Sequence, residues 1–387
     1  MLKISGFRRE NGQFGVRNYL LILPTSVCAS DTAAKIAAQV PGAIAVPNQH
    51  GCCHIGYDLT QTVMTLEGFG KNANVGAVLV VGLGCEGIQA EALADKIRVS
   101  GKPVDFIIIQ KCGGTLKAIS AGVEKAAKMA ALLSTQPRVE GDVSDIILGL
   151  ECGGSDPTSG LASNPAIGYV SDKLVNLGGT SILSETTEVI GAEHLLAARF
   201  ADEKERAKFL RMVKECEGRA IKLGADLRNG QPTPGNKEGG ISTIEEKSLG
   251  CMYKAGVSPF QAALEYAEWV PEKKGLYFMD TPGQDIDSIT GMVAGGATVI
   301  IFSTGRGTPT GSPIAPVIKI TGNTDTYNNM IDNIDINAGK IITHGATLKD
   351  IGEEAFNLML EVCQGRLTKA EALGHREFGI YRIGWTF

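Results

Sequence analysis

The sequence lacks a long apolar segment, a run of basic residues and an internal repeat. No stretch approaches the roughly 18 consecutive apolar residues that a membrane-spanning helix needs, and residues 1–13 have no apolar core of the kind found in signal peptides. The net charge of −5, without any basic stripe, gives no reason to expect a nucleic-acid partner. The nine cysteines are scattered and odd in number, so we expect reduced thiols in a cytoplasmic protein.

The composition is that of a globular protein large enough for more than one domain. Of the 387 residues, 43% are hydrophobic and 20% are charged, which excludes a disordered chain. The 49 glycines occur singly or in pairs at turns, without a fibrous period. The length predicts two domains, each with its own core.

Short β-branched runs alternate with helix-like segments from residue 18 to about residue 150. The predicted strands are Tyr19–Leu23, Ala43–Val46, Ala77–Val81, Val104–Ile109 and Asp145–Leu148, and the predicted helices are Asp31–Gln39, Ile88–Ser100 and Leu116–Leu133. Such alternation predicts an α/β fold with layered parallel sheets, and in open α/β sheets ligands bind at the carboxyl ends of the strands. The polar segment 134–145 predicts a boundary between a first α/β domain, residues 1–140, and a larger catalytic α/β domain, residues 141–387.

The second half repeats the alternation and adds a long loop. We expect strands near 180–184, 275–280, 297–303 and 317–320, and helices at 165–177, 201–223 and 350–364. The loop at 228–240 is rich in Gly and Pro and too long for a simple turn, which is typical of functional loops. Residues 1–17 carry many charges and little apolar surface, so we expect a surface segment there.

Four cysteines follow predicted strands: Cys28, Cys52, Cys85 and Cys152. Thiolates delivered from several strand ends could converge on one soft metal centre or iron–sulfur cluster. The alternative is that each packs as a small hydrophobic residue. Cys112 has a similar place, whereas Cys53, Cys216, Cys251 and Cys363 are expected to be incidental.

Several further segments carry candidate site residues, each with a structural alternative. The turn at 151–165 offers an anion site with Ser155, Asp156 and Asn164, or an ordinary helix start. Arg306, close to Thr304, lies among glycines and hydroxyls and could grip a carboxylate, or be an exposed turn residue.

The remaining candidates are acidic or histidine-containing. Glu185 and Glu188 follow a predicted strand and could act as metal ligands or in proton transfer, or simply carry helix-start charge. The segment His50–His54 resembles half of a zinc site without a second half. The aspartates at 280, 285 and 287 suit a hard cation or a turn. The glycines at 82, 84 and 87 match a dinucleotide fingerprint, but the next predicted strand has no acidic residue at its end.

Long motifs spread over nearly the whole chain resemble one family, the altronate/galactarate dehydratases. They are GFRRENGQFGVRN, PTSVCA, VVGLGCE, CGGSDPTSGLASNPAIG, SETTEVIGAEHLL, PTPGNKEGGISTIEEKSLG, DTPGQD, FSTGRGTPTGSPIAPVIK and DINAG. The resemblance implies an iron-dependent hydro-lyase that converts sugar acids to 2-keto-3-deoxy acids. Its cysteine pattern matches the same four residues, Cys28, Cys52, Cys85 and Cys152.

One feature departs from the single-chain members, which carry a small β-rich domain before the segment that starts at Gly6. Either the small domain is a separate subunit or the protein works without it; we expect a separate small β-rich subunit that docks near the N-terminus, and we also expect a homo-oligomer. A related two-subunit enzyme, the sulfolactate sulfo-lyase, eliminates sulfite, and its large subunit lacks cysteines at the positions of Cys28 and Cys52. Their presence here favours a dehydratase.

We therefore expect a hydro-lyase that dehydrates a sugar acid of the altronate or galactarate type. The cofactor is expected to be iron, either as Fe(II) or as an iron–sulfur cluster, with Cys28, Cys52, Cys85 and Cys152 as ligands. The catalytic candidates are Arg306, Lys237, Glu185 and His54, and the candidates for substrate binding are Ser155, Asp156, Asn164 and Thr304. The alternatives are the large subunit of a sulfolactate-type sulfo-lyase and a non-catalytic scaffold subunit.

Overall fold

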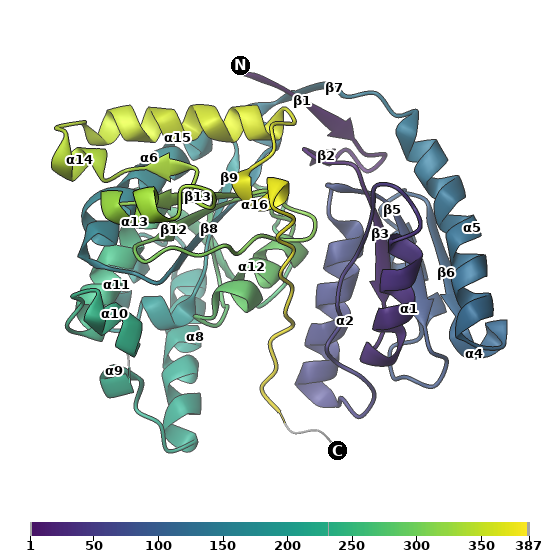
Figure 1. Cartoon of the computed structure of the whole chain (residues 1–387). Helices are drawn as coiled ribbons and strands as arrows, with labels where there is room; N and C mark the ends of the chain where they lie inside the picture. Colours follow the sequence, from purple (N-terminus) through teal and green to yellow (C-terminus); the bar gives the residue numbers. More distant parts are fainter. Residues whose placement is uncertain (1, 231, 385–387) are drawn as a thin grey trace.

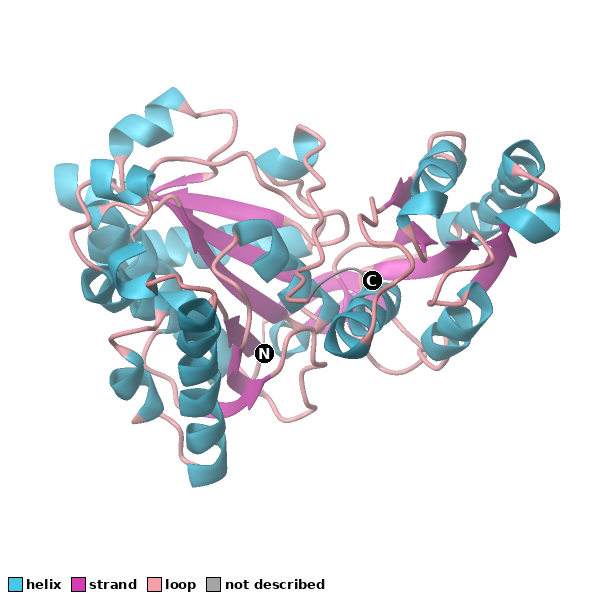
Figure 2. Ribbon diagram, turned by 90° about the horizontal axis from the view of Figure 1, so that it is seen from below, coloured by secondary structure: helices cyan, strands magenta, loops and turns pink. Residues whose placement is uncertain are grey.

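The computed structural model describes residues 2–230 and 232–384, and it confirms the α/β fold. Two parallel sheets, of four and seven strands, are each flanked by helices, and a small antiparallel sheet of three strands joins them. Figures 1 and 2 show the two helix-flanked groups of strands side by side. Among the helices that the structure describes, none is long and apolar enough to cross a membrane.

The four-stranded sheet has the order β4-β3-β5-β6 and is built from the first part of the chain. Its strands are β3 (Tyr19–Pro24), β4 (Ala43–Ala45), β5 (Val75–Gly82) and β6 (Val104–Ile108). All eight residues of β5 are buried, as expected for a parallel strand covered on both faces. One face packs on α1 (Val27–Ala37) and α5 (Thr115–Ser134), and the other packs on α2 (Gly56–Lys71) and α3 (Ala90–Arg98). The four-residue helix α4 (Ile109–Cys112) follows β6.

The seven-stranded sheet has the order β10-β11-β9-β8-β12-β13-β14, and all of its pairs are parallel. Its strands are β8 (Ile147–Gly153), β9 (Thr180–Leu183), β10 (Phe260–Leu264), β11 (Gly275–Met279), β12 (Val299–Thr304), β13 (Val317–Thr321) and β14 (Ile336–Asn337). The central pair β8 and β12 is in register from Leu148 with Val299 to Gly153 with Thr304. The carboxyl ends of these two strands therefore lie next to each other.

Helices also cover both faces of the larger sheet. The helices with buried residues on one face are α6 (Asn164–Asn176), α8 (Glu203–Lys222) and α15 (Leu348–Cys363), and α12 (Asp285–Ala294) packs on the other. Shorter helices are α7 (Glu193–Ala197), α9 (Leu227–Gly230), α10 (Pro234–Glu238), α11 (Ile244–Met252), α13 (Thr324–Asn329), α14 (Lys340–Thr343) and α16 (Lys369–Ala372), with short 3-10 turns at Val143–Asp145, Thr186–Glu188 and Tyr253–Ala255 and a π-helical turn at Ser159–Ser163.

The N-terminal residues are not the simple surface segment that their charges predict. Residues Lys3–Arg8 form β1, which pairs antiparallel with β2 (Phe14–Gly15) and with β7 (Val139–Asp142). Ile4 and Phe14 are buried in the core of the larger unit. The prediction was wrong because the few apolar residues of this segment become buried only when the segment pairs with β7. That strand is more than a hundred residues away in the sequence.

One hydrophobic core continues from the first sheet to the second. Helices α2 and α12 contact each other at Gly68 and Ala294. A Cβ atom at position 68 would lie 2.2 Å from the carbonyl oxygen of Ala294. The buried side-chain amide of Asn74 donates to the carbonyls of Thr298 and Ile314. The C-terminal segment runs down between the two groups of elements (Figure 1), where Phe378 packs edge-on against Phe69.

Candidate active site

A cavity of about 320 Å³ opens at the carboxyl edge of the seven-stranded sheet. The end of β8 contributes Cys152, Gly153 and Gly154, the segment after β12 contributes Arg306, and the start of α12 contributes Asp285. The remaining lining residues are Glu188, Thr233, Gly235, Asn236, Lys247 and Gly283. Gly153 allows this arrangement, since a Cβ there would meet the Asp285 carboxylate at 2.3 Å.

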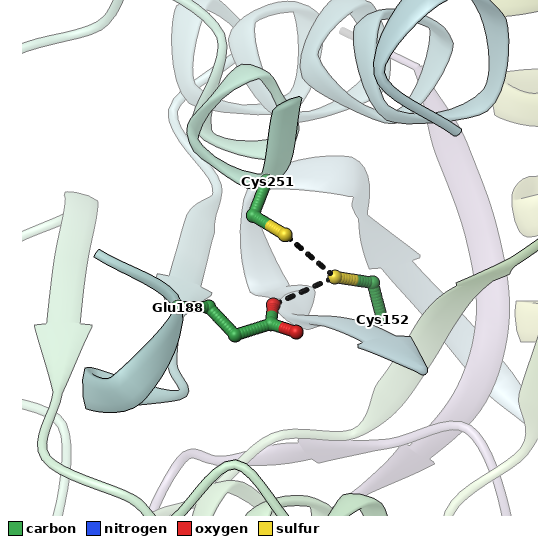
Figure 3. A group of neighbouring side chains, drawn as sticks. All are labelled: Cys152, Glu188 and Cys251. Carbon is green, nitrogen blue, oxygen red and sulfur yellow. Dashed lines mark hydrogen bonds between the residues drawn. The ribbon is translucent and has the colours of Figure 1, made fainter. Parts of the chain in front are cut away.

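Two buried thiols and a carboxylate lie close together (Figure 3), and Cys152 and Glu188 of this group line the cavity. The thiol of Cys152 donates to Glu188 Oε2 at 2.7 Å, and its sulfur lies 3.4 Å from the sulfur of Cys251. Cys152 ends strand β8, Glu188 lies in the turn after β9, and Cys251 lies in α11. The pKa of the Cys152 thiol is raised well above its ordinary value, mainly because the thiol is buried and also because Cys251 lies next to it.

Two lysines neutralise this cluster. The Lys254 side chain is 1% exposed, and its ammonium donates to Cys152 Sγ at 2.7 Å and to Glu185 Oε2 at 2.8 Å. Lys247 pairs with Glu188 Oε1 at 3.0 Å and lines the cavity. Burial works to raise the pKa of Glu188, but the two ammonium groups outweigh it and hold that pKa below its ordinary value.

Glu185 adopts a backbone conformation that side chains rarely occupy. Its φ is +70°, in the left-handed region, and such strain is typical of functional sites. The carboxylate is fully buried and accepts the backbone N–H of Cys152 at 3.0 Å. Burial and then the charge of Glu188 raise the pKa of Glu185 to about 8. The structure places this predicted site residue in direct contact with Cys152 and Lys254.

Glu185 also belongs to a group of three carboxylates whose oxygens lie within 4.8 Å of one another, with Glu151 and Asp285. Burial, then Glu188, raises the pKa of Asp285 to about 6, and burial, then Glu185, raises the pKa of Glu151 well above its ordinary value. One oxygen each of Glu151 and Glu185 has no hydrogen-bond partner among the described residues. This group is a second candidate for holding a cation, beside Cys152, Glu188 and Cys251.

Arg306 reaches the cavity and is held there by the loop that the sequence singles out. Its guanidinium donates to the carbonyl of Gly235 at 3.3 Å and lies 3.6 Å from Glu238. Lys237, the weaker catalytic candidate in this loop, is exposed on α10 and does not line the cavity. The loop therefore contacts the predicted carboxylate-binding residue through its backbone and through Glu238.

The predicted substrate-binding residues divide into two kinds. Asp156 and Thr304 are occupied in holding turns: Asp156 Oδ1 accepts from Thr158 and Ser159, and Thr304 Oγ1 accepts from the backbone N–H of Gly307. Ser155 and Asn164, by contrast, each have a buried oxygen with no partner among the described residues. Ser155, Asp156 and Asn164 line a second cavity beside the first.

Three of the four predicted metal-binding cysteines lie at the other sheet. Cys28, Cys52 and Cys85 are exposed thiols that follow β3, β4 and β5, which are neighbours in the four-stranded sheet. Cys152 is buried in the larger sheet and packs with Cys251 instead. Among residues 2–230 and 232–384, the groups of three or more metal-ligating atoms within 4.8 Å include none of Cys28, Cys52 and Cys85.

The Cys52 loop nevertheless approaches the larger sheet. His50 lies close enough to Asp287, at the start of α12, to act on its pKa, and Tyr57 lies close enough to Asp280, after β11, to be affected by its charge. His50 Nε2 is 2.7 Å from the carbonyl of Ile380 in the C-terminal segment. The rings of His54 and His50 lie with their centres 4.6 Å apart and their planes tilted by 57°, and burial lowers the pKa of His54. The structure thus places His54 in the loop that faces the second sheet, outside the cavity itself.

Lys247, Cys251 and Lys254 are the functional candidates that the sequence reasoning missed. They recur at helical spacing, four and three residues apart, along α11 and the turn that follows it. That spacing puts them on one face of a helix, so the segment IEEKSLGCMYK carried a readable signal. Cys251 is not among the predicted ligands because it does not follow a predicted strand.

A crevice at the carboxyl ends of parallel strands, lined by paired ammonium, guanidinium, thiol and carboxylate groups, is the arrangement of an α/β enzyme. Residues 143–386 match the family described as D-galactarate/altronate dehydratase, C-terminal, and residues 6–134 match D-galactarate dehydratase/altronate hydrolase, second domain. The chain therefore belongs to the D-galactarate/altronate dehydratase family, and it is a lyase.

Three relatives show how far this likeness extends. The (2R)-sulfolactate sulfo-lyase subunit beta of Chromohalobacter salexigens is 37% identical over 98% of this chain and 97% of its own length. The altronate dehydratases of Bacillus subtilis and Escherichia coli are 35% and 36% identical, over 98% of this chain and 78% of their own lengths.

Proposed function

We propose that the chain removes water from a 2,3-dihydroxy sugar acid to give a 2-keto-3-deoxy acid, with iron as the cofactor. The observation that carries this proposal is that Arg306, Lys247 and Asp285 line one cavity. The reaction needs loss of a proton next to a carboxylate and departure of the neighbouring hydroxyl. The cavity offers cations that can bind the carboxylate and a base that can accept the proton.

Arg306 and Lys247 are proposed to bind the substrate carboxylate. The guanidinium of Arg306 can grip a carboxylate in bidentate fashion, and Lys247 stays charged because the carboxylate of Glu188 outweighs the effect of burial on its pKa. Both cations would stabilise the negative charge that builds up on the carboxylate as the proton leaves.

Asp285 is the proposed general base. It lines the cavity, and its pKa of about 6 leaves it mostly ionised at neutral pH while keeping it close to the optimum for proton transfer. The loss of water gives an enol, which tautomerises to the keto acid.

Iron is proposed to lie at the edge of the four-stranded sheet, on Cys28, Cys52 and Cys85. Three exposed thiols at the ends of adjacent strands form a soft ligand set, which suits iron–sulfur centres. Their sulfurs are not all within 4.8 Å of one another, whereas a single tetrahedral ion would hold thiolates roughly 4 Å apart. The residues therefore fit a cluster better than a single ion, and a cluster with one open iron would supply Lewis acidity to the substrate oxygens.

Mononuclear Fe(II) on carboxylates is the rival arrangement. The Cys152, Glu188 and Cys251 group fits it poorly, because Lys254 and Lys247 already occupy its acceptors. Glu151, Glu185 and Asp285 fit better, since two of their oxygens have no partner among the described residues.

A substrate panel tests the proposed reaction. Iron-loaded chain, purified without oxygen, is assayed with altronate, galactarate and (2R)-sulfolactate for keto-acid formation and for sulfite release. Keto acid from a sugar acid supports the proposal. Sulfite from sulfolactate, with no product from either sugar acid, would instead support the sulfo-lyase alternative, which the full-length match to the sulfo-lyase subunit favours.

We further propose a small partner subunit. The supporting observation is the relative named subunit beta, which this chain matches over 97% of that relative's length. Activity is to be measured with the chain alone and with a co-purified small protein from the native host. Full activity of a homo-oligomer of this chain would exclude a required partner.

A further inference from the structure

A second cavity, of about 250 Å³, lies beside the first on the other side of the turn at residues 154–155. Gly154 lines the first cavity and Ser155 lines the second, while Lys247 lines both. The two cavities are therefore neighbours along one wall of the site, and Lys247 belongs to both.

The floor of the second cavity holds two polar atoms without partners. Ser155 and Asn164 are 2% and 1% exposed, and neither Ser155 Oγ nor Asn164 Oδ1 has a hydrogen-bond partner among the described residues. Asn164 is fixed in place, because its Nδ2 donates to the carbonyl of Gly250 at 2.9 Å. A buried polar atom left unpaired costs on the order of 1–3 kcal/mol, so these two atoms are suited to a ligand that pairs with them.

The position of these atoms on a cavity separates them from other unpaired hydroxyls. Ser171 and Ser181 are also buried and without a partner in the described part of the chain, yet they line none of the cavities at the site. The rim of the second cavity is apolar and partly exposed, with Leu161, Leu249 and Tyr253. A polar floor under an apolar rim fits a carbon chain that carries hydroxyl groups.

We propose that this second cavity binds the hydroxyl groups on the far carbons of a polyhydroxy carboxylic acid, and so selects substrates longer than three carbons. The inference rests on the proposed function, because it takes the reacting carboxylate to lie on Arg306 and Lys247. Asn164 Oδ1 accepts from one hydroxyl, and Ser155 Oγ donates to or accepts from another. A three-carbon acid bound in the first cavity does not extend to either atom.

The test compares a six-carbon and a three-carbon acid in matched variants. Iron-loaded full-length protein is assayed with D-altronate and with D-glycerate, and binding of both acids is measured by calorimetry. The variant is Ser155→Ala, which removes an unpaired hydroxyl and therefore should not lower the melting temperature, and the control is Ser181→Ala, which removes an unpaired hydroxyl elsewhere. A second pair is Leu249→Trp, which narrows the rim, and Leu195→Trp, which adds the same side chain at an exposed position on α7.

Ser155→Ala is expected to raise the KM and Kd for altronate by about three- to tenfold, the effect of one neutral hydrogen bond. The same variant should leave the KM and Kd for glycerate within twofold of the wild-type values. Both control variants should have wild-type values of KM and Kd for either acid. Equal altronate binding by wild type, Ser155→Ala and Leu249→Trp would overturn the subsite, as would an equal loss for both acids.

The same measurements separate failure of the subsite from failure of the proposed function. Altronate that binds and depends on Ser155 but is not dehydrated by iron-loaded wild type would contradict the proposed reaction alone. Altronate that is dehydrated equally well by wild type and Ser155→Ala would contradict the subsite alone. Absence of altronate binding to wild type would overturn the subsite.

Discussion

At the scale of single residues, Arg306 is the exposed cation that is proposed to bind the substrate carboxylate. Arg306→Lys keeps the charge but loses the bidentate fork, which should cost roughly 1.5–3 kcal/mol, or about a tenfold to hundredfold loss in kcat/KM. Steady-state kinetics with the best acid of the panel measure it. Arg366→Lys, at an exposed surface arginine, is the matched control. Parental kcat/KM in Arg306→Lys would exclude the carboxylate-clamp role.

The buried acid Glu185 should make stability depend on pH. Its pKa in the folded protein, about 8, lies above the ordinary value of 4.5. Between these values the folded chain keeps a proton that the unfolded chain has lost, so the contribution of Glu185 is fully present below about pH 4.5 and is lost as the pH rises towards 8. Glu185→Gln removes this titration while keeping the shape of the side chain.

Denaturant unfolding of both proteins between pH 5 and 8.5 measures the effect. Relative to Glu185→Gln, wild type should lose roughly 2 to 5 kcal/mol of unfolding free energy across this range. Two parallel pH profiles would show that Glu185 is ionised in the folded protein over the whole range.

Sequence reasoning selected candidates that follow strands and passed over those on helices. Cys152, Glu185 and Arg306 were selected because each ends or follows a strand of the larger sheet. Lys254 and Cys251 were missed because they meet Cys152 only through tertiary packing, which no local pattern reports. The separation of Cys152 from Cys28, Cys52 and Cys85 was equally hidden, since it depends on which sheet each strand joins.

At the scale of elements, a buried arginine ties the start of the chain to its end. Arg17, just before β3, makes a bidentate ion pair with Glu371 of α16 at 2.8 Å, and it donates to the carbonyls of Val362 in the last turn of α15 and of Arg366 just after it. The side chains of the pair are 8% and 10% exposed. Losing the Arg17 cation would therefore leave the buried Glu371 carboxylate without this counter-ion.

Arg17→Met should lower the free energy of unfolding by about 3–5 kcal/mol, measured by urea unfolding. Lys3→Met removes an exposed partner of Glu140 and should change it by less than about 1 kcal/mol. Equal values for the two variants would mean that the Arg17 pair does not hold the two ends together.

The elements that the sequence predicted well are those with a strong local pattern. The strand predicted at Tyr19–Leu23 and the helix predicted at Leu116–Leu133 lie within one residue of the observed Tyr19–Pro24 and Thr115–Ser134. Helix α2 was not predicted, because its sequence mixes glycines and threonines that are weak helix formers. Tertiary packing against α12 stabilises it instead, through the close approach of Gly68 to Ala294.

At the scale of the whole molecule, the proposed site draws on both parallel sheets. The larger sheet supplies the cavity with Arg306, Lys247 and Asp285, and the smaller supplies three exposed thiols and the His50–His54 loop that faces α12. The C-terminal segment fixes this loop, since Gln49 and His50 both bond the carbonyl of Ile380, and the backbone N–H groups of Ile383 and Gly384 donate to Asp58. The account therefore depends on the metal lying on the smaller sheet.

Iron and acid-labile sulfide, measured together on protein purified without oxygen, test that claim most directly. The measurement is made on wild type, on Cys85→Ser, and on Glu151→Gln, which alters the carboxylate group of the larger sheet. The account predicts iron with a comparable amount of sulfide in wild type and in Glu151→Gln, and loss of both, together with activity, in Cys85→Ser. Iron without sulfide that is retained in Cys85→Ser and lost in Glu151→Gln would contradict it.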